Sequence, residues 1–227
     1  MITDYEAHSP IAEAYRAVRI NLQFASAGDA IKYISFTSAT PSEGKSTTVA
    51  NLAITMAQDG KRVLLIDADM RKPVVHRRFG LPNKGLSNYI AMKVSFANLV
   101  ERDVVPNLDI LASGPVPPNP SELLGAPRMK QLFEEVADEY DYVFIDMPPV
   151  LAVTDAAILA SKVDRVVFVV KSGADSPDEL KLAKTSLIQA GANIMGVILN
   201  AVPQRHHAGY YYYYYYDDEG NKTRKKR

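Results

Sequence analysis

The sequence contains no cysteine. This absence excludes disulfide bonds, thiolate metal sites, cysteine nucleophiles and iron–sulfur clusters that are held by cysteine. An excess of charge of one sign is also missing, because 26 lysine and arginine residues balance 26 aspartate and glutamate residues. A neutral chain has no overall field that would attract nucleic acid or lipid, so we expect no nucleic-acid partner.

Long apolar runs are missing as well. No run in the sequence approaches the roughly 18 residues that a membrane-spanning helix needs. Residues 1–6 lack the basic and apolar regions of a secretory signal peptide. We therefore expect a cytoplasmic protein that reaches a membrane only through a partner or a surface contact.

Apolar residues make up 47% of the 227, which is enough for the core of one domain of ordinary size. Short β-branched or apolar runs alternate with helical patterns, which is typical of a doubly wound, mostly parallel α/β sheet. The expected strands are residues 31–37, 62–66, 108–111, 142–145, 165–170 and 194–199. The expected helices are residues 10–24, 46–59, 127–139, 154–161 and 177–190.

Residues 39–46 read Ala-Thr-Pro-Ser-Glu-Gly-Lys-Ser and lie between an expected strand and an amphipathic helix. This placement is typical of a phosphate-binding loop, in which backbone N–H groups and a helix N-terminus converge on anionic oxygens. Lys45 would bind the terminal phosphates and Ser46 a Mg²⁺ ion. Because Ala39 stands where the usual pattern has glycine, the prediction depends on the neighbouring strand and helix as well as on the motif.

Acidic residues follow two further expected strands. Asp67 and Asp69 come directly after one, with Arg71 close behind, and Asp146 comes after another. The carboxyl ends of parallel strands border the ligand crevice of such a sheet. A single acid at this position is as often a helix cap or a turn residue. Three of them beside a phosphate loop predict a Mg²⁺ site.

Together these motifs resemble the bacterial tyrosine kinases of the capsule and exopolysaccharide type, in the form in which the cytoplasmic kinase is a separate chain. The resemblance covers nearly everything from Glu13 to the end. It rests on five features: a Walker A-like loop (39–47), a Walker A′-like segment (64–73), a proline-containing segment (113–124), a Walker B-like segment (144–149) and a run of tyrosines (210–216).

The resemblance implies an ATP- and Mg²⁺-dependent protein-tyrosine kinase of P-loop NTPase type that phosphorylates itself, mainly between subunits, and regulates capsular or exopolysaccharide synthesis and export. It implies catalytic roles for Lys45, Asp67, Asp69 and Arg71. The nucleotide-binding positions would be Thr40, Pro41, Ser42, Glu43, Gly44, Lys45, Ser46, Thr47 and Asn200, and the metal ligands Ser46, Asp67 and Asp146. Two assignments stay open: Asp67 is either a general base or only a metal ligand, and Asn200 is either an adenine contact or a strand-end turn residue.

The expected phosphate acceptors are Tyr210, Tyr211, Tyr212, Tyr213, Tyr214, Tyr215 and Tyr216. Three acidic residues follow them, and the run begins about 35 Å at most from Asn200 if the chain between is extended. Length therefore permits transfer within a chain and between chains, and the resemblance favours transfer to a neighbour. Without a donor site, a low-complexity tail without chemistry would be the preferred explanation.

Glu13, Arg16 and Arg19 share one broad face of an expected helix. They could form an internal ion pair on a solvated face, whereas in the resembling family this pattern assembles subunits into a ring. We therefore divide the chain into a helical oligomerisation segment, residues 1–30, a kinase core, residues 31–202, and a flexible tyrosine-rich tail, residues 203–227. The resemblance also implies a protein-tyrosine phosphatase as partner, and recruitment to the inner face of the cell membrane by the cytoplasmic tail of a transmembrane co-polymerase.

Two other functions are compatible with the fold. Partition and cell-division ATPases share a lysine just before the phosphate-loop glycines. This chain has Thr40 at that position, which argues against that class. Its tyrosine-rich tail also takes the place of the amphipathic helix that a membrane-bound division ATPase needs. A non-catalytic, nucleotide-dependent scaffold for polysaccharide export is the second alternative.

Overall fold

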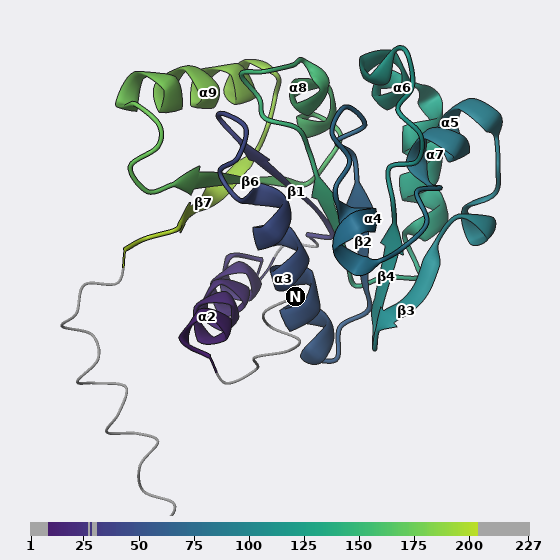
Figure 1. The fold of residues 1–227 in the computed structure, drawn as a ribbon, viewed down its shortest axis with the longest axis horizontal. Helices are drawn as coiled ribbons and strands as arrows, with labels where there is room; N and C mark the ends of the chain where they lie inside the picture. The colour runs from purple at the N-terminus through teal and green to yellow at the C-terminus, as the bar shows by residue number, and fades with distance from the viewer. Residues whose placement is uncertain (1–8, 27, 29–30, 204–227) are drawn as a thin grey trace, which may run out of the picture.

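The computed structural model describes residues 9–26, 28 and 31–203. At its centre lies a seven-stranded sheet with the order β3-β4-β2-β5-β1-β6-β7 (Figure 1). Its strands are β1 (Tyr33–Ser38), β2 (Val63–Asp67), β3 (Glu101–Val105), β4 (Leu108–Leu111), β5 (Tyr142–Asp146), β6 (Arg165–Lys171) and β7 (Ile194–Asn200). All neighbouring strands run parallel except β3 and β4, which are antiparallel. The expected doubly wound, mostly parallel fold is confirmed.

Helices cover both faces of this sheet (Figure 1). On one face lie α2 (Pro10–Ala25), α3 (Lys45–Gln58) and the short α4 (Val75–Phe79), which share a core with the sheet. The other face is covered by α5 (Leu86–Met92), the 3-10 turn η1 (Phe96–Asn98), α6 (Pro120–Gly125), α7 (Pro127–Val136), α8 (Asp155–Ala160) and α9 (Pro177–Gln189).

Successive strand residues supply the two cores alternately. In β2, Val63 and Leu65 belong to the core under α3, whereas Leu64 and Ile66 belong to the core on the opposite face. This alternation follows from the two-residue period of a strand, and burial on both faces explains why β2 is apolar up to its last residue. The last residue, Asp67, is thereby placed at the carboxyl edge of the sheet beside Asp146 of β5.

The helix ends agree with local sequence signals. Ser9 caps α2 by accepting a hydrogen bond from Ala12 N at 3.1 Å, and Ser176 and Glu179 form a capping box at the start of α9. Within the described ranges, no helix combines the length and the apolar character needed to span a bilayer.

Candidate active site

The phosphate-loop segment connects the end of β1 with the start of α3. Gly44, the residue before the helix, has a φ of 85°, and Ser42 also adopts a positive φ of 70°. Since Lys45 is the first residue of a 14-residue helix, the free N–H groups of the first turn face the loop. Thr47 lies in this turn, where its carbonyl accepts a hydrogen bond from Asn51 at 2.8 Å.

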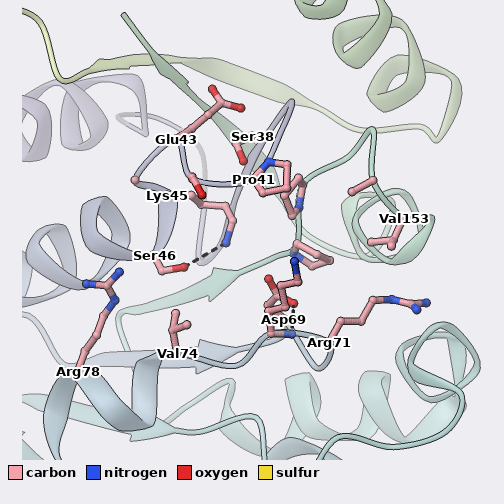
Figure 2. Close-up of a pocket in the computed structure, with 16 residues that line it drawn as sticks. Ser38, Pro41, Glu43, Lys45, Ser46, Asp69, Arg71, Val74, Arg78 and Val153 are labelled. Atoms are coloured by element: carbon pink, nitrogen blue, oxygen red, sulfur yellow. Dashed lines mark hydrogen bonds between the residues drawn. The ribbon is translucent and has the colours of Figure 1, made fainter. Parts of the chain in front are cut away.

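A cavity of about 430 Å³ opens beside this loop (Figure 2). It is lined by residues of the loop, of the segment after β2 and of the segment after β5: Ser38, Pro41, Ser42, Glu43, Gly44, Lys45, Ser46, Asp69, Arg71, Lys72, Val74, Arg78, Pro148, Pro149, Ala152 and Val153. Eight of the predicted site residues are among them, whereas Thr40, Thr47, Asp67, Asp146 and Asn200 are not.

Lys45 lies between the cavity and the buried edge of the sheet. Its ammonium group forms an ion pair with Asp146. It also donates a hydrogen bond of 3.3 Å to Ser46 Oγ (Figure 2). Both charges are largely removed from water, with side-chain exposures of 6% for Lys45 and 0% for Asp146. The second carboxylate oxygen of Asp146, Oδ2, is buried without a hydrogen-bond partner among the described residues. A buried anionic oxygen of this kind is suitable for binding a cation.

Asp67 is fully buried and does not line the cavity. Its carboxylate accepts hydrogen bonds from three backbone N–H groups, of Asp69 at 3.1 Å, Val74 at 3.1 Å and Val75 at 3.0 Å. Burial, followed by the nearby charge of Asp146, raises the pKa of Asp67 to about 7. The side chain thus organises the loop after β2, and its role as base or metal ligand stays a prediction.

Asp69 and Arg71 follow on the same loop and line the cavity. Asp69 Oδ1 accepts a hydrogen bond from Lys72 N at 3.0 Å. The Arg71 guanidinium points away from Ser46 (Figure 2) and forms a bidentate pair with Asp155, with two hydrogen bonds of 3.0 Å. Ser121 adds a 2.6 Å hydrogen bond to the same carboxylate. Arg71 therefore joins the Walker A′-like loop to α8 and α6.

Asn200 lies behind the phosphate loop, at the end of β7. Its side-chain Nδ2 donates a hydrogen bond of 2.8 Å to the carbonyl oxygen of Glu43. The Glu43 side chain and Thr40 also form hydrogen bonds within the loop, at 2.7 Å between Thr40 N and Glu43 Oε1. These predicted nucleotide-binding residues are therefore brought together at the phosphate loop, although only Glu43 lines the cavity.

The predicted oligomerisation residues lie on α2, outside the lining of this cavity. Glu13 and Arg16 form the ion pair that their spacing allows. Arg19 binds α3 instead, with a hydrogen bond of 3.2 Å to the Thr55 carbonyl and an ion pair of 3.0 Å with Asp59. The predicted acceptors, Tyr210 to Tyr216, lie outside the described residues.

ATP and Mg²⁺ are compatible with these residues. Asp146 Oδ2 has no hydrogen-bond partner in the described part of the chain, and Ser46 Oγ lies within hydrogen-bond distance of Lys45 at the start of α3. No group of three or more histidine, aspartate or glutamate side chains in the described ranges could hold an ion alone. Mg²⁺ seldom uses such cages, because it is usually bound by one or two carboxylates together with phosphate oxygens and waters.

Sequence reasoning missed three residues of the site. Lys72 and Arg78 line the cavity, and neither side chain has an ion-pair partner among the described residues. Asp155 holds Arg71. Lys72 could have been noticed from its place beside Arg71, whereas Asp155 and Arg78 give no signal without the tertiary structure.

Comparisons with known proteins agree with this geometry. A family profile described as an AAA domain matches residues 31–182. The tyrosine-protein kinase YwqD of Bacillus subtilis (strain 168) is 45% identical over 204 residues, which cover 89% of this chain and 86% of YwqD. The tyrosine-protein kinase CpsD of Streptococcus agalactiae is 38% identical over 192 residues, which cover 84% of this chain and 83% of CpsD. Among solved structures, the kinase domain of the Escherichia coli tyrosine kinase ETK has a TM-score of 0.87 and 39% identity, covering 90% of this chain and 80% of that domain.

More distant structures share the fold alone. The septum site-determining protein MinD from Pyrococcus horikoshii OT3, complexed with Mg-ADP, has a TM-score of 0.64 at 22% identity, covering 78% of this chain and 72% of MinD. The kinases match at much higher identity over nearly the whole described core. The chain belongs to the bacterial tyrosine-protein kinase family.

Proposed function

We propose that this protein transfers the terminal phosphoryl group of ATP to the tyrosines at residues 210–216 of a neighbouring copy, in control of capsular or exopolysaccharide synthesis and export. The observation that carries the proposal is that Lys45 and Ser46 line a cavity, with Asp146 ion-paired to Lys45, in a chain that also contains a run of tyrosines. Membership of the tyrosine-protein kinase family supports the same reaction.

Bound Mg²⁺ would neutralise charge on the phosphates, with Ser46, Asp146 and Asp67 as the residues of this chain that would hold it. Lys45 would exchange its ion pair with Asp146 for the terminal phosphates. The tyrosine oxygen forms the new bond to phosphorus while the bond from phosphorus to the bridging oxygen of ADP breaks. Because a phenol has a pKa of about 10, a carboxylate must accept its proton. Asp69 is the candidate for this base, because it lines the cavity, whereas Asp67 is fully buried and does not line it. Glu43 also lines the cavity, but its carboxylate accepts hydrogen bonds from Thr40 N and Lys171 N.

The charges around the cavity support an acceptor segment with acidic residues. Lys72 and Arg78 line the cavity, are exposed and have no ion-pair partner within the described part of the chain. In the sequence, residues 217–219 are Asp, Asp and Glu, directly after the tyrosine run. Opposite charges at these places would favour the docking of the tail from a neighbour.

We further propose that a transmembrane co-polymerase recruits and activates the kinase at the inner face of the membrane. A protein-tyrosine phosphatase would reverse the modification.

We also propose that the subunits assemble into a ring through Glu13, Arg16 and Arg19. Arg19 also contributes to the packing of α2 on α3, because it binds the Thr55 carbonyl and Asp59. Substitution of Glu13 and Arg16 by alanine, with Arg19 kept, should therefore reduce the oligomer in light scattering without unfolding the helix. An unchanged oligomer in this double variant and in the triple variant would contradict the assignment.

The reaction itself is tested with the Lys45→Met variant. Wild-type protein, supplied with the cytoplasmic tail of the partner and ATP, should gain phosphate on residues 210–216, measured by mass spectrometry of the tail. Lys45→Met should lose this signal, because the phosphates lose their cation. Since Asp146 also loses its ion-pair partner, circular dichroism must show that the variant is folded. Free phosphate without modified tyrosine would indicate an ATPase, and neither product would indicate a scaffold.

A further inference from the structure

The phosphate loop forms hydrogen bonds with the last residues of two strands, β6 and β7. Asn200, the last residue of β7, donates a 2.8 Å hydrogen bond through Nδ2 to the carbonyl of Glu43. Next to this carbonyl is Gly44, with a φ of 85°, and any side chain at residue 44 would overlap the Asn200 amide. The amide of Asn200 thus contacts the loop where its backbone takes a conformation suited to glycine.

The Glu43 side chain makes the second connection. Its carboxylate is buried, at 2% exposure, and accepts hydrogen bonds from Thr40 N at 2.7 Å and from Lys171 N at 3.1 Å. Lys171 is the last residue of β6 and is the register partner of Asn200. One carboxylate therefore joins the first turn of the loop to β6, while the amide of Asn200 joins the last peptide of the loop to β7.

We infer that Asn200 and Glu43 are positioning residues that hold the backbone of the phosphate loop in its binding conformation. This inference rests on the proposed nucleotide binding. The carbonyl that Asn200 holds belongs to the peptide that carries the Gly44 N–H, and Glu43 fixes the start of the loop through the Thr40 N–H. Donors that are prearranged in this way bind an anion without first paying an ordering entropy. Because the contact is made to the loop, its effect applies to any ligand that carries the phosphate chain, whatever its base.

A contact with adenine would behave differently. If the Asn200 amide only contacted the base, its substitution would lower the affinity for ATP and leave the affinity for a ligand without a base unchanged. Substitution of Asn200 by aspartate separates the two roles further. Aspartate keeps an acceptor oxygen for the base, but it cannot donate to the Glu43 carbonyl and would bring two oxygens together.

The test compares wild type, Asn200→Ala, Asn200→Asp and the control Asn98→Ala, an exposed asparagine of η1. Affinities for ATP and inorganic tripolyphosphate are measured with Mg²⁺ by displacement of a fluorescent ATP analogue. Asn200→Ala should weaken both by a similar factor of about ten, the effect of one lost hydrogen bond, and Asn200→Asp by at least as much. A loss confined to ATP, or no loss, would overturn the inference.

A second measurement needs no ligand and separates this inference from the proposed function. Amide hydrogen exchange of residues 40–46 in the free protein should be faster in Asn200→Ala and in Glu43→Gln than in wild type, while exchange in β2 and β5 stays unchanged. Unchanged exchange in the loop would contradict a positioning role even if the protein is a kinase. Faster exchange would support it even if the tail is not phosphorylated.

Discussion

The carboxyl group of Asp67 lies in surroundings that oppose its ionisation. It is fully buried and close to the charges of Asp146 and Asp69, and only Lys45 and the backbone N–H groups favour the anion. The net effect raises its pKa from an ordinary value of about 4 to about 7. In the free protein, a large fraction of the molecules therefore carries a proton on Asp67 below neutral pH.

The raised pKa predicts that binding of Mg²⁺ with nucleotide releases a proton. If Asp67 holds the cation as proposed, it must be ionised to do so, and the affinity should fall as the pH drops below about 7, by at most tenfold per pH unit. Isothermal titration calorimetry in buffers of different ionisation enthalpy should show a larger proton release at pH 6 than at pH 8. Asp67→Asn should abolish this pH dependence. Binding by wild type without proton release at either pH would contradict the prediction.

Part of the site could be predicted at the level of single residues. Lys45, Asp67 and Asp146 follow from the rule that parallel strands end at a common edge, and β5 indeed lies between β1 and β2. The pair of Arg71 and Asp155 could not be predicted in this way. It joins residues 84 positions apart, and it depends on how α8 packs against α6.

At the scale of secondary structure, the strand β3 depends on side-chain contacts with its neighbours. Asp109 of β4 accepts hydrogen bonds from Tyr140 at 2.6 Å, from Arg102 at 2.8 Å and from the backbone of Asp103 at 2.8 Å. Burial, followed by the hydrogen bond to Asp109, raises the pKa of Tyr140. These contacts fix the antiparallel edge of an otherwise parallel sheet.

Removal of the Tyr140 hydroxyl should weaken this edge. Tyr140→Phe leaves the largely buried Asp109 with one partner fewer, so we expect the free energy of unfolding to fall by about 1–2 kcal/mol. Urea denaturation measures this change. Tyr142→Phe serves as the control, because the structure gives the Tyr142 hydroxyl no hydrogen bond among the described residues, and it should change stability by less than about 0.5 kcal/mol. Equal stability of both variants would contradict the prediction.

The burial of each element explains which strands and helices the sequence could predict. All six expected strands and all five expected helices are present, because apolar runs and helical periodicity reflect burial directly. The strand β3 was missed because its residues Glu101, Arg102 and Asp103 are polar and half-buried or exposed. The short helices α4, α5 and α6 were missed because five to seven residues are too few for a periodic pattern.

At the scale of the whole molecule, phosphorylation should change the state of assembly. Each phosphotyrosine adds about −1.5 to −2 charges, so several on one tail bring roughly ten negative charges together. Unmodified tails should dock in neighbouring sites and help to hold the oligomer, whereas modified tails should be repelled and release it. Analytical ultracentrifugation of both forms measures the change.

Fully phosphorylated protein should sediment as a smaller species than unmodified protein, and phosphatase treatment should restore the larger one. The control is a variant with residues 210–216 replaced by phenylalanine, which keeps the aromatic rings and cannot be phosphorylated. It should remain assembled after incubation with ATP. Identical sedimentation of the modified and unmodified forms would rule out this switch.

The end of strand β7 connects the tyrosine-rich tail with the phosphate loop of the same subunit. The strand ends at Asn200, whose amide donates a hydrogen bond to the phosphate loop, and the tyrosine-rich tail, residues 203–227, begins three residues later. A neighbour that holds the tail would therefore act close to a contact of the phosphate loop in the subunit to which the tail belongs. Docking and release of the tail would in this way be linked to the nucleotide site of the subunit that donates it.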